Sequence, residues 1–135
     1  MIRLEPGCLA TLRDHCAHAT GHGAGGLLVG WTASPGRRFA LSAHPCPSLD
    51  GGAASLDPGD YLRVQAEADE AGLEVVGHYR VGPWTWAPEG IHPGISYVRV
   101  RCDGGVLRVD SASLDEQAGP FALSGEPVET EVERR

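Results

Sequence analysis

Apolar residues recur along the first part of the chain in patterns typical of one helix followed by two strands. After Pro6, apolar side chains return at helical spacing, at Leu9, Leu12, Cys16 and Ala19. The apolar run Gly26-Leu-Leu-Val-Gly30 is bounded by glycines, which is typical of a buried strand. A turn at Pro35-Gly36 and a second strand over residues 38–43 are predicted to follow, and then a loop over residues 45–52.

A second helix is predicted to begin after Asp57 and to end at Gly72. Asp57 is suited to the N-cap, Pro58 to the first helical position, and Gly72 to the C-terminal stop. Strands are predicted beyond it over residues 73–81, 95–102 and 106–110, and the last two are joined by a hairpin turn at Asp103-Gly104-Gly105.

This order of elements predicts an α+β (α/β) fold, with one mixed central sheet flanked by helices. A chain of 135 residues fits a single domain. We expect that domain to span residues 1–125. Residues 126–135 are expected to form an acidic C-terminal tail, or an edge strand over residues 128–132.

Composition excludes several classes of function. The net charge is −7, which argues against binding to a nucleic-acid backbone. All 11 basic residues are arginines, so neither a Schiff-base lysine nor a P-loop lysine is present. No apolar run approaches the ~20 residues that span a bilayer, and the first residues are too polar for a signal peptide. We therefore expect a cytoplasmic protein without membrane contact.

Cysteine and histidine spacing gives no metal-site pattern. The cysteines, Cys8, Cys16, Cys46 and Cys102, include no C-x-x-C pair. Cys16 and Cys102 fall on apolar faces of their elements and are predicted to be core thiols. His15, His18 and His22 follow helical spacing, and we interpret them as a solvated face.

Three segments in this order resemble the JAMM/MPN family of zinc metalloproteases: Gly26-Leu-Leu-Val-Gly30, Asp57-Pro-Gly-Asp-Tyr61 and Leu73-Glu-Val-Val-Gly-His-Tyr79. Pro93-Gly-Ile-Ser-Tyr-Val98 resembles the family's strand after the active-site loop. The resemblance is to the small bacterial branch associated with sulfur-carrier and ubiquitin-like proteins. It implies an MPN/JAMM-like fold, similar to that of cytidine deaminases.

The family's catalytic residues are missing here. In the family, two histidines of a His-Ser-His-Pro motif and a later aspartate hold zinc, and a glutamate before the Gly-Leu-Leu strand is the general base. The resemblance places Arg80 and Gly82 at the histidine positions and Gly23 at the glutamate position, and the aspartate turn is deleted. A guanidinium cannot deprotonate to become a ligand. The resemblance thus implies a degenerate member, with no metal residues and no zinc or other cofactor.

A polar cluster is predicted to border the vacated site. His78 and Arg80 are two residues apart on one strand, so their side chains point to the same side, and Glu89 and His92 lie in the following loop. These four are weak catalytic candidates, because Arg80 suits a carboxylate or another anion and histidine suits acid–base work. The alternative is that Arg80 pairs with an acidic residue and His78 packs in the core.

Aromatic side chains give a second candidate surface. Trp84 and Trp86 flank a threonine in a proline-bounded loop, and Tyr79 is retained from the family motif. Together with Arg80 they are candidate binding residues, because loop tryptophans are enriched at interfaces. The alternative is that the tryptophans fill the emptied zinc cavity.

These features favour a non-catalytic binding or scaffold protein, although an enzymatic role is left open. The resemblance implies a protein partner: another MPN domain, a second copy in a homodimer, or a ubiquitin-like or sulfur-carrier protein with a Gly-Gly tail. One alternative is a repurposed, metal-independent enzyme acting on a small molecule in the vacated pocket. The other is a residual zinc isopeptidase with ligands rebuilt from His78, His92 and Glu89.

Overall fold

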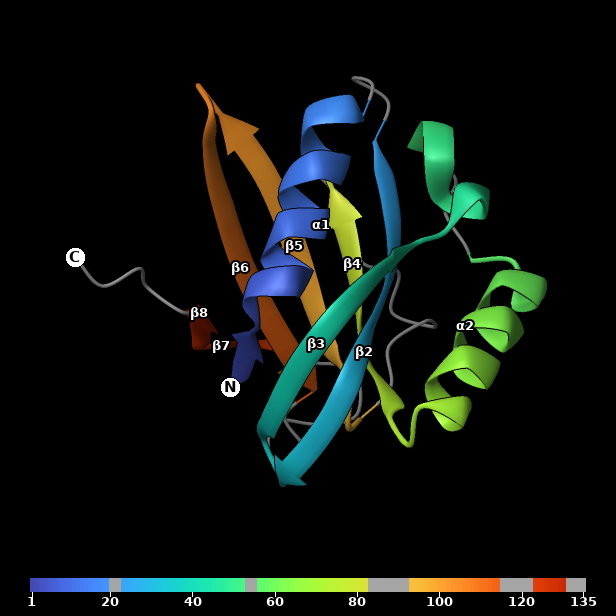
Figure 1. The fold of residues 1–135 in the computed structure, drawn as a ribbon. Helices are drawn as coiled ribbons and strands as arrows, with labels where there is room; N and C mark the ends of the chain where they lie inside the picture. The colour runs from blue at the N-terminus through green and yellow to red at the C-terminus, as the bar shows by residue number, and fades with distance from the viewer. Residues whose placement is uncertain (20–22, 53–55, 83–92, 115–122, 131–135) are drawn as a thin grey trace.

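A strongly curved mixed sheet forms the centre of the protein (Figure 1). This computed structural model describes residues 1–19, 23–52, 56–82, 93–114 and 123–130. Within these ranges the chain forms eight strands: β1 (Ile2–Leu4), β2 (Ala24–Ser34), β3 (Arg37–Pro45), β4 (Glu74–Val81), β5 (Ser96–Asp103), β6 (Val106–Leu114), β7 (Leu123–Glu126) and β8 (Val128–Thr130). Their order in the sheet is β7-β6-β5-β4-β2-β3-β1-β8.

Two α-helices, α1 (Pro6–His18) and α2 (Pro58–Glu70), confirm the predicted helices. A short 3-10 helix, η1 (Pro47–Gly52), lies within the segment predicted to be a loop. Gly72 follows α2 with φ +71°, a conformation that favours glycine and ends the helix as predicted. No helix in the described ranges is long and apolar enough to cross a membrane.

Asp57 occupies the predicted N-cap position of α2, but the capping hydrogen bond expected of its side chain is not formed. The start of α2 is held against η1 instead. The Ser48 amide donates to the Asp60 carboxylate at 3.1 Å, and the Asp57 amide donates to the Ser48 hydroxyl at 3.1 Å.

The segment of residues 123–130 nearly closes the sheet. Its first half, β7, pairs antiparallel with β6 at one end of the strand order, and its second half, β8, pairs parallel with β1 at the other end. Pro127 lies between the halves, and its carbonyl accepts a hydrogen bond from the Ile2 amide at 3.1 Å. Closure is incomplete beside the first half of β6. A cavity of about 350 Å³ lies there, lined by Leu9, Arg13, Leu107, Val109, Val128 and Thr130.

Each face of the sheet packs against one helix, which gives the protein two core clusters. Helix α1 lies in the concave face and contributes Cys8, Leu12 and Cys16 to the larger cluster. Helix α2 covers the outer face of β2 and β4 with Val64 and Ala68. The first seven residues of β2 (24–30) are buried on both faces, which explains the unbroken apolar run there.

Long-range pairing defines the elements that the sequence pattern did not predict. β1 and β7 have only three and four residues, too few to show a period of two, and each exists through its partners. The prediction that Cys102 is a core thiol is wrong. Its side chain continues the face of Val98 and Val100 towards α1, but it lies at the sheet end and is exposed.

A buried carboxylate, that of Glu126, ties the closing segment to the rest of the sheet. It accepts hydrogen bonds from the Met1 ammonium at 2.9 Å and from the Ser111 hydroxyl at 2.7 Å. The Arg38 guanidinium, itself buried, lies 3.6 Å away. Burial acts to raise the pKa of Glu126, but hydrogen bonds from Ser96, the ammonium and Ser111 outweigh it, and the pKa is lowered.

Replacing Glu126 should therefore destabilise the fold. We expect Glu126→Gln to lower the free energy of unfolding by about 3–5 kcal/mol at pH 7, because it leaves Arg38 and the ammonium without their buried counter-charge. Because the pKa of Glu126 is lowered in the folded state, its contribution is present above the unfolded pKa and is lost as the pH falls through the folded pKa. Urea unfolding between pH 7 and pH 3, with both proteins side by side, measures this.

The control is Glu129→Gln, which removes an exposed carboxylate 3.8 Å from Arg3. An exposed pair contributes about 0–1 kcal/mol, so this variant should unfold almost like the original protein. Equal destabilisation by the two substitutions, or a Glu126→Gln deficit that does not shrink in acid, would contradict the role given to Glu126.

Candidate functional site

The candidate site lies at the end of the molecule where β2 begins and both β4 and α1 end. Ala24 at the start of β2 pairs with Val81 at the end of β4, so Gly23 and Gly82 fall at the same rim. The last turn of α1 reaches this end of the sheet as well (Figure 1). The rim therefore brings together the positions that the family resemblance singled out.

Arg80 is buried on the outer face of β4. It pairs across the sheet with Gly25, and a Cβ atom on Gly25 would lie 3.1 Å from Arg80 Cδ and 3.0 Å from Leu49 Cδ1. The absence of a side chain at Gly25 thus makes room for the arginine stem between β2 and η1. Arg80 is 6% exposed, and burial lowers the pKa of its guanidinium, although an arginine stays charged in a folded protein.

His78 lies on the same face as Arg80, as strand alternation predicts. It pairs across the sheet with Leu27, and its imidazole stacks on the Tyr97 ring of β5 at 5.6 Å between centroids with 22° between planes. Tyr97 is buried. His78 itself is half-buried and stacks against the sheet, so its assignment to the core stays a prediction.

The other predicted site residues, Trp84, Trp86, Glu89 and His92, lie outside the described residues. Within the described ranges, no group of three or more His, Cys, Asp and Glu side chains is arranged to hold a metal ion. The ligand set rebuilt from His78, His92 and Glu89 stays a prediction.

Gly23 and Gly82 both have a backbone conformation that favours glycine. Gly23 has φ +89° and Gly82 has φ +108°, a region that residues with side chains rarely adopt. A glutamate at position 23 or a histidine at position 82 would be strained there. Arg80, at the other position that the resemblance assigns to a histidine, is a fixed cation.

A histidine–tyrosine pair, missed in the sequence, lies on the concave side of the same rim. His15 Nδ1 of α1 and the Tyr79 hydroxyl of β4 are 2.7 Å apart, and the rings meet edge to face at 84°. The interpretation of His15 as a solvated residue is wrong, because it is half-buried and turned towards the sheet. Helical spacing placed it beside His18 and gave no information on a partner in a distant strand.

The pair is suited to holding a proton at a defined place. Burial raises the pKa of Tyr79, so its hydroxyl stays protonated and can donate to Nδ1 of a neutral imidazole. Burial also lowers the pKa of His15, and the negative charges of Asp50 and Asp14 oppose that shift without cancelling it. His15 is therefore predominantly neutral at pH 7.

Comparisons with known proteins find solved structures of similar fold but give no information on activity. The chain is similar to the solution structure of protein DSY2949 from Desulfitobacterium hafniense, with a TM-score of 0.77 and 19% identity over 98% of this chain and 94% of that one. It is also similar to the solution structure of a protein from Salinibacter ruber, with a TM-score of 0.65 and 25% identity over 95% of this chain and 90% of that one. Both are described as structural genomics targets. No protein-family model and no curated protein matches the chain.

The positive φ at Gly82 gives a direct prediction. We expect Gly82→Ala to lower the free energy of unfolding by about 1–3 kcal/mol, because the new Cβ disfavours this backbone conformation. Gly125→Ala is the matched control, since its φ is ordinary and nothing lies within 4 Å of the added Cβ. Its effect should stay within about 0.5 kcal/mol. Denaturant unfolding measures the free energy of unfolding of both variants. An equal loss in the two would contradict the backbone strain expected in Gly82→Ala.

The His15–Tyr79 hydrogen bond gives another prediction. We expect His15 to titrate below the ordinary value of 6.5, and Tyr79→Phe to raise its pKa, because the neutral imidazole loses a donor. With a lowered folded pKa, the stability linked to His15 is complete above pH 6.5 and is lost as the pH falls from 6.5 to the folded pKa. NMR titration of the His15 ring measures the shift. Tyr61→Phe on α2 should leave it unchanged, and an unchanged titration in Tyr79→Phe would refute the coupling.

Proposed function

We propose that this chain is a protein-binding module with an MPN/JAMM-like fold that works without zinc and without peptidase activity. The observation that carries the proposal is the rim itself. Arg80 is buried there, and Gly23 and Gly82 adopt positive φ where the resemblance requires a glutamate and a histidine. A site with this backbone and a fixed cation at a ligand position does not fit a zinc-bound water.

The packing of the predicted polar cluster supports binding over small-molecule catalysis. His78 stacks on Tyr97, and Arg80 is 6% exposed. Arg80 is thus buried and His78 half-buried, whereas an open pocket would present both side chains to solvent. The part of the cluster that the structure describes therefore contributes to packing.

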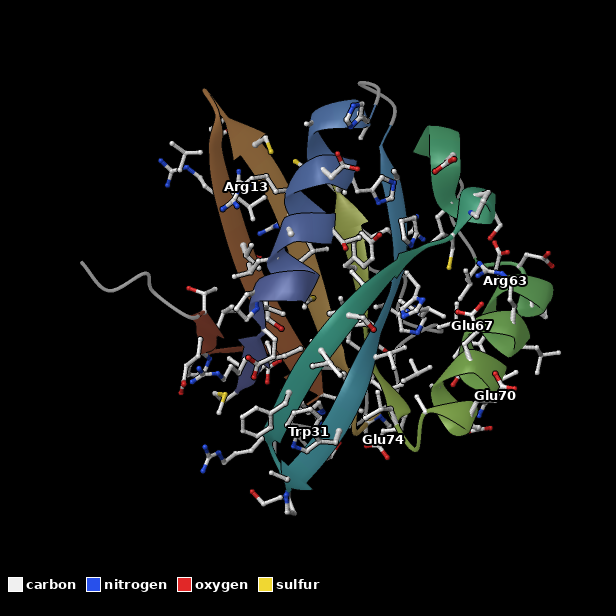
Figure 2. All side chains as sticks on the ribbon, viewed as in Figure 1. Arg13, Trp31, Arg63, Glu67, Glu70 and Glu74 are labelled. Atoms are coloured by element: carbon white, nitrogen blue, oxygen red, sulfur yellow. The ribbon has the colours of Figure 1, made fainter. Side chains whose placement is uncertain are left out.

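An exposed aromatic surface on the β2–β3 hairpin supports a protein partner. Trp31 is 39% exposed and stacks on Phe39, with ring centroids 5.1 Å apart and planes at 9° (Figure 2). The Arg37 guanidinium lies over the Phe39 ring at 5.9 Å. Leu41 extends this hairpin surface and is 42% exposed. Tryptophan and arginine are enriched at the centres of protein interfaces, so we take this surface as the contact region.

The proposed partner is a ubiquitin-like or sulfur-carrier protein ending in Gly-Gly, the class that the family resemblance implies. The test titrates the full chain with such a carrier by NMR and calorimetry. We expect Trp31→Ala to weaken binding at least tenfold, as loss of a central interface tryptophan typically does. Leu62→Ala on α2 is the control, because Leu62 is also an exposed apolar residue, at 63%, but lies outside the hairpin surface.

The same experiment separates binding from proteolysis. A fusion of the carrier's Gly-Gly tail to a second protein, incubated with the chain and Zn²⁺, should remain intact. Zinc-dependent cleavage would establish an isopeptidase and overturn the proposal. Absence of binding to the carrier, or equal binding by Trp31→Ala, would reject the proposed partner and surface.

The His15–Tyr79 pair favours a second candidate function, a metal-independent enzyme acting on a small molecule. A neutral imidazole hydrogen-bonded to a protonated tyrosine is a competent acid–base pair at neutral pH. The observation that favours this enzyme is the position of the pair at the rim. This function would require that Tyr79→Phe abolish turnover of a bound small molecule while leaving binding to the carrier unchanged.

A further inference from the structure

The fold brings two cysteines from distant parts of the chain into contact. Cys16 lies in the last turn of α1, and Cys102 lies at the end of β5. Cys102 pairs across the sheet with Leu107, which packs against the core cluster beneath α1, so its thiol points towards the helix. The two thiols contact each other, and both are free.

Exposure separates the roles of the two thiols. Cys102 is exposed, whereas Cys16 is 9% exposed beneath it. The other two cysteines, Cys8 and Cys46, are fully buried. A reagent in solution can therefore reach the Cys102 sulfur far more readily than the Cys16 sulfur.

Burial also keeps the Cys16 thiol protonated. Burial raises the pKa of Cys16 to about 12, and contact with Cys102 and the charge of Asp103 add to this. Cys16 thus stays protonated while Cys102 is a free thiol. Once the Cys102 sulfur is bonded to another sulfur, one of the causes that raise the pKa of Cys16 is removed.

We propose that Cys16 and Cys102 form a redox-active dithiol, oxidised to an intramolecular disulfide by thiol–disulfide exchange with a low-molecular-weight disulfide. The assignment rests on three observations: the two sulfurs are in contact, one of them is exposed, and the other is shielded. It does not depend on the proposed binding function.

The exchange proceeds in two balanced steps. The Cys102 thiolate attacks one sulfur of the small disulfide, which forms a mixed disulfide and releases one small thiolate. The Cys16 thiol then loses its proton and attacks the Cys102 sulfur, which releases the second small thiolate. The small disulfide gains two electrons and, after protonation, leaves as two thiols, while the protein loses two hydrogen atoms.

Oxidation would fix the end of α1 to the sheet beside the candidate site. Cys16 follows His15 directly, and His15 is hydrogen-bonded to Tyr79. A bond from Cys16 to β5 would therefore restrain the turn that holds the imidazole. The oxidised protein should also resist denaturant better, because the bond closes a long loop in the unfolded chain.

The test treats the reduced full chain with a series of ratios of oxidised to reduced glutathione and reads out mass and free thiols. We expect two of the four thiols to be lost, with the mass falling by two hydrogen atoms and peptide mapping locating a Cys16–Cys102 bond. Cys8 and Cys46 should remain free. Dithiothreitol should restore all four thiols, and the oxidised form should unfold at a higher urea concentration than the reduced form.

Two variants assign the steps. Cys102→Ser, at an exposed position, should retain the fold and lose all reaction with glutathione disulfide. Cys16→Ala should stop at the mixed disulfide on Cys102, which adds the mass of one glutathione. Accumulation of that same adduct in the unsubstituted protein, without the loss of two hydrogen atoms, would overturn the proposal. So would oxidation at Cys8 or Cys46, or no reaction in an oxidising glutathione buffer.

Discussion

The buried Glu126 carboxylate is the interaction on which the closed form of the sheet depends. It lies in the segment that joins the two ends of the strand order, and it accepts hydrogen bonds from the Met1 ammonium, which precedes β1, and from the Ser111 hydroxyl of β6. Few side chains could bridge these strands at once, because the site is buried and offers both a cation and hydroxyl donors. With the ends held together, the curvature of the sheet encloses α1 and brings its last turn to the rim.

The larger part of the fold follows from local pattern, and the closure does not. Helices α1 and α2 and the central strands were predicted because each is long enough to show its own periodicity. β1 and β7 were missed because they are short and are defined by pairing with strands far away in sequence. Glu126 reads in sequence as part of an acidic tail. Only the fold shows that its charge is buried.

The candidate site, too, could be predicted from local pattern only in part. Alternation along β4 placed His78 and Arg80 on one face, which the structure confirms. Alternation could not show that Arg80 lies in the space left by Gly25, because that depends on cross-strand register. The His15–Tyr79 pair and the Cys16–Cys102 contact each join α1 to a strand, so no local pattern could have found them. The glycines at positions 23 and 82 were visible, but their φ values were not.

The near-closure of the sheet also limits how another chain can attach to it. β8 covers β1 and β7 covers the second half of β6, whereas the first half of β6 extends beyond β7 without a strand beside it. That stretch carries Arg108 and Asp110, paired with Asp103 and Arg99, and such charges discourage strand addition. Addition of an extended peptide to this stretch of β6 is therefore disfavoured. The same charges disfavour edge-to-edge association of two copies of the sheet through β6.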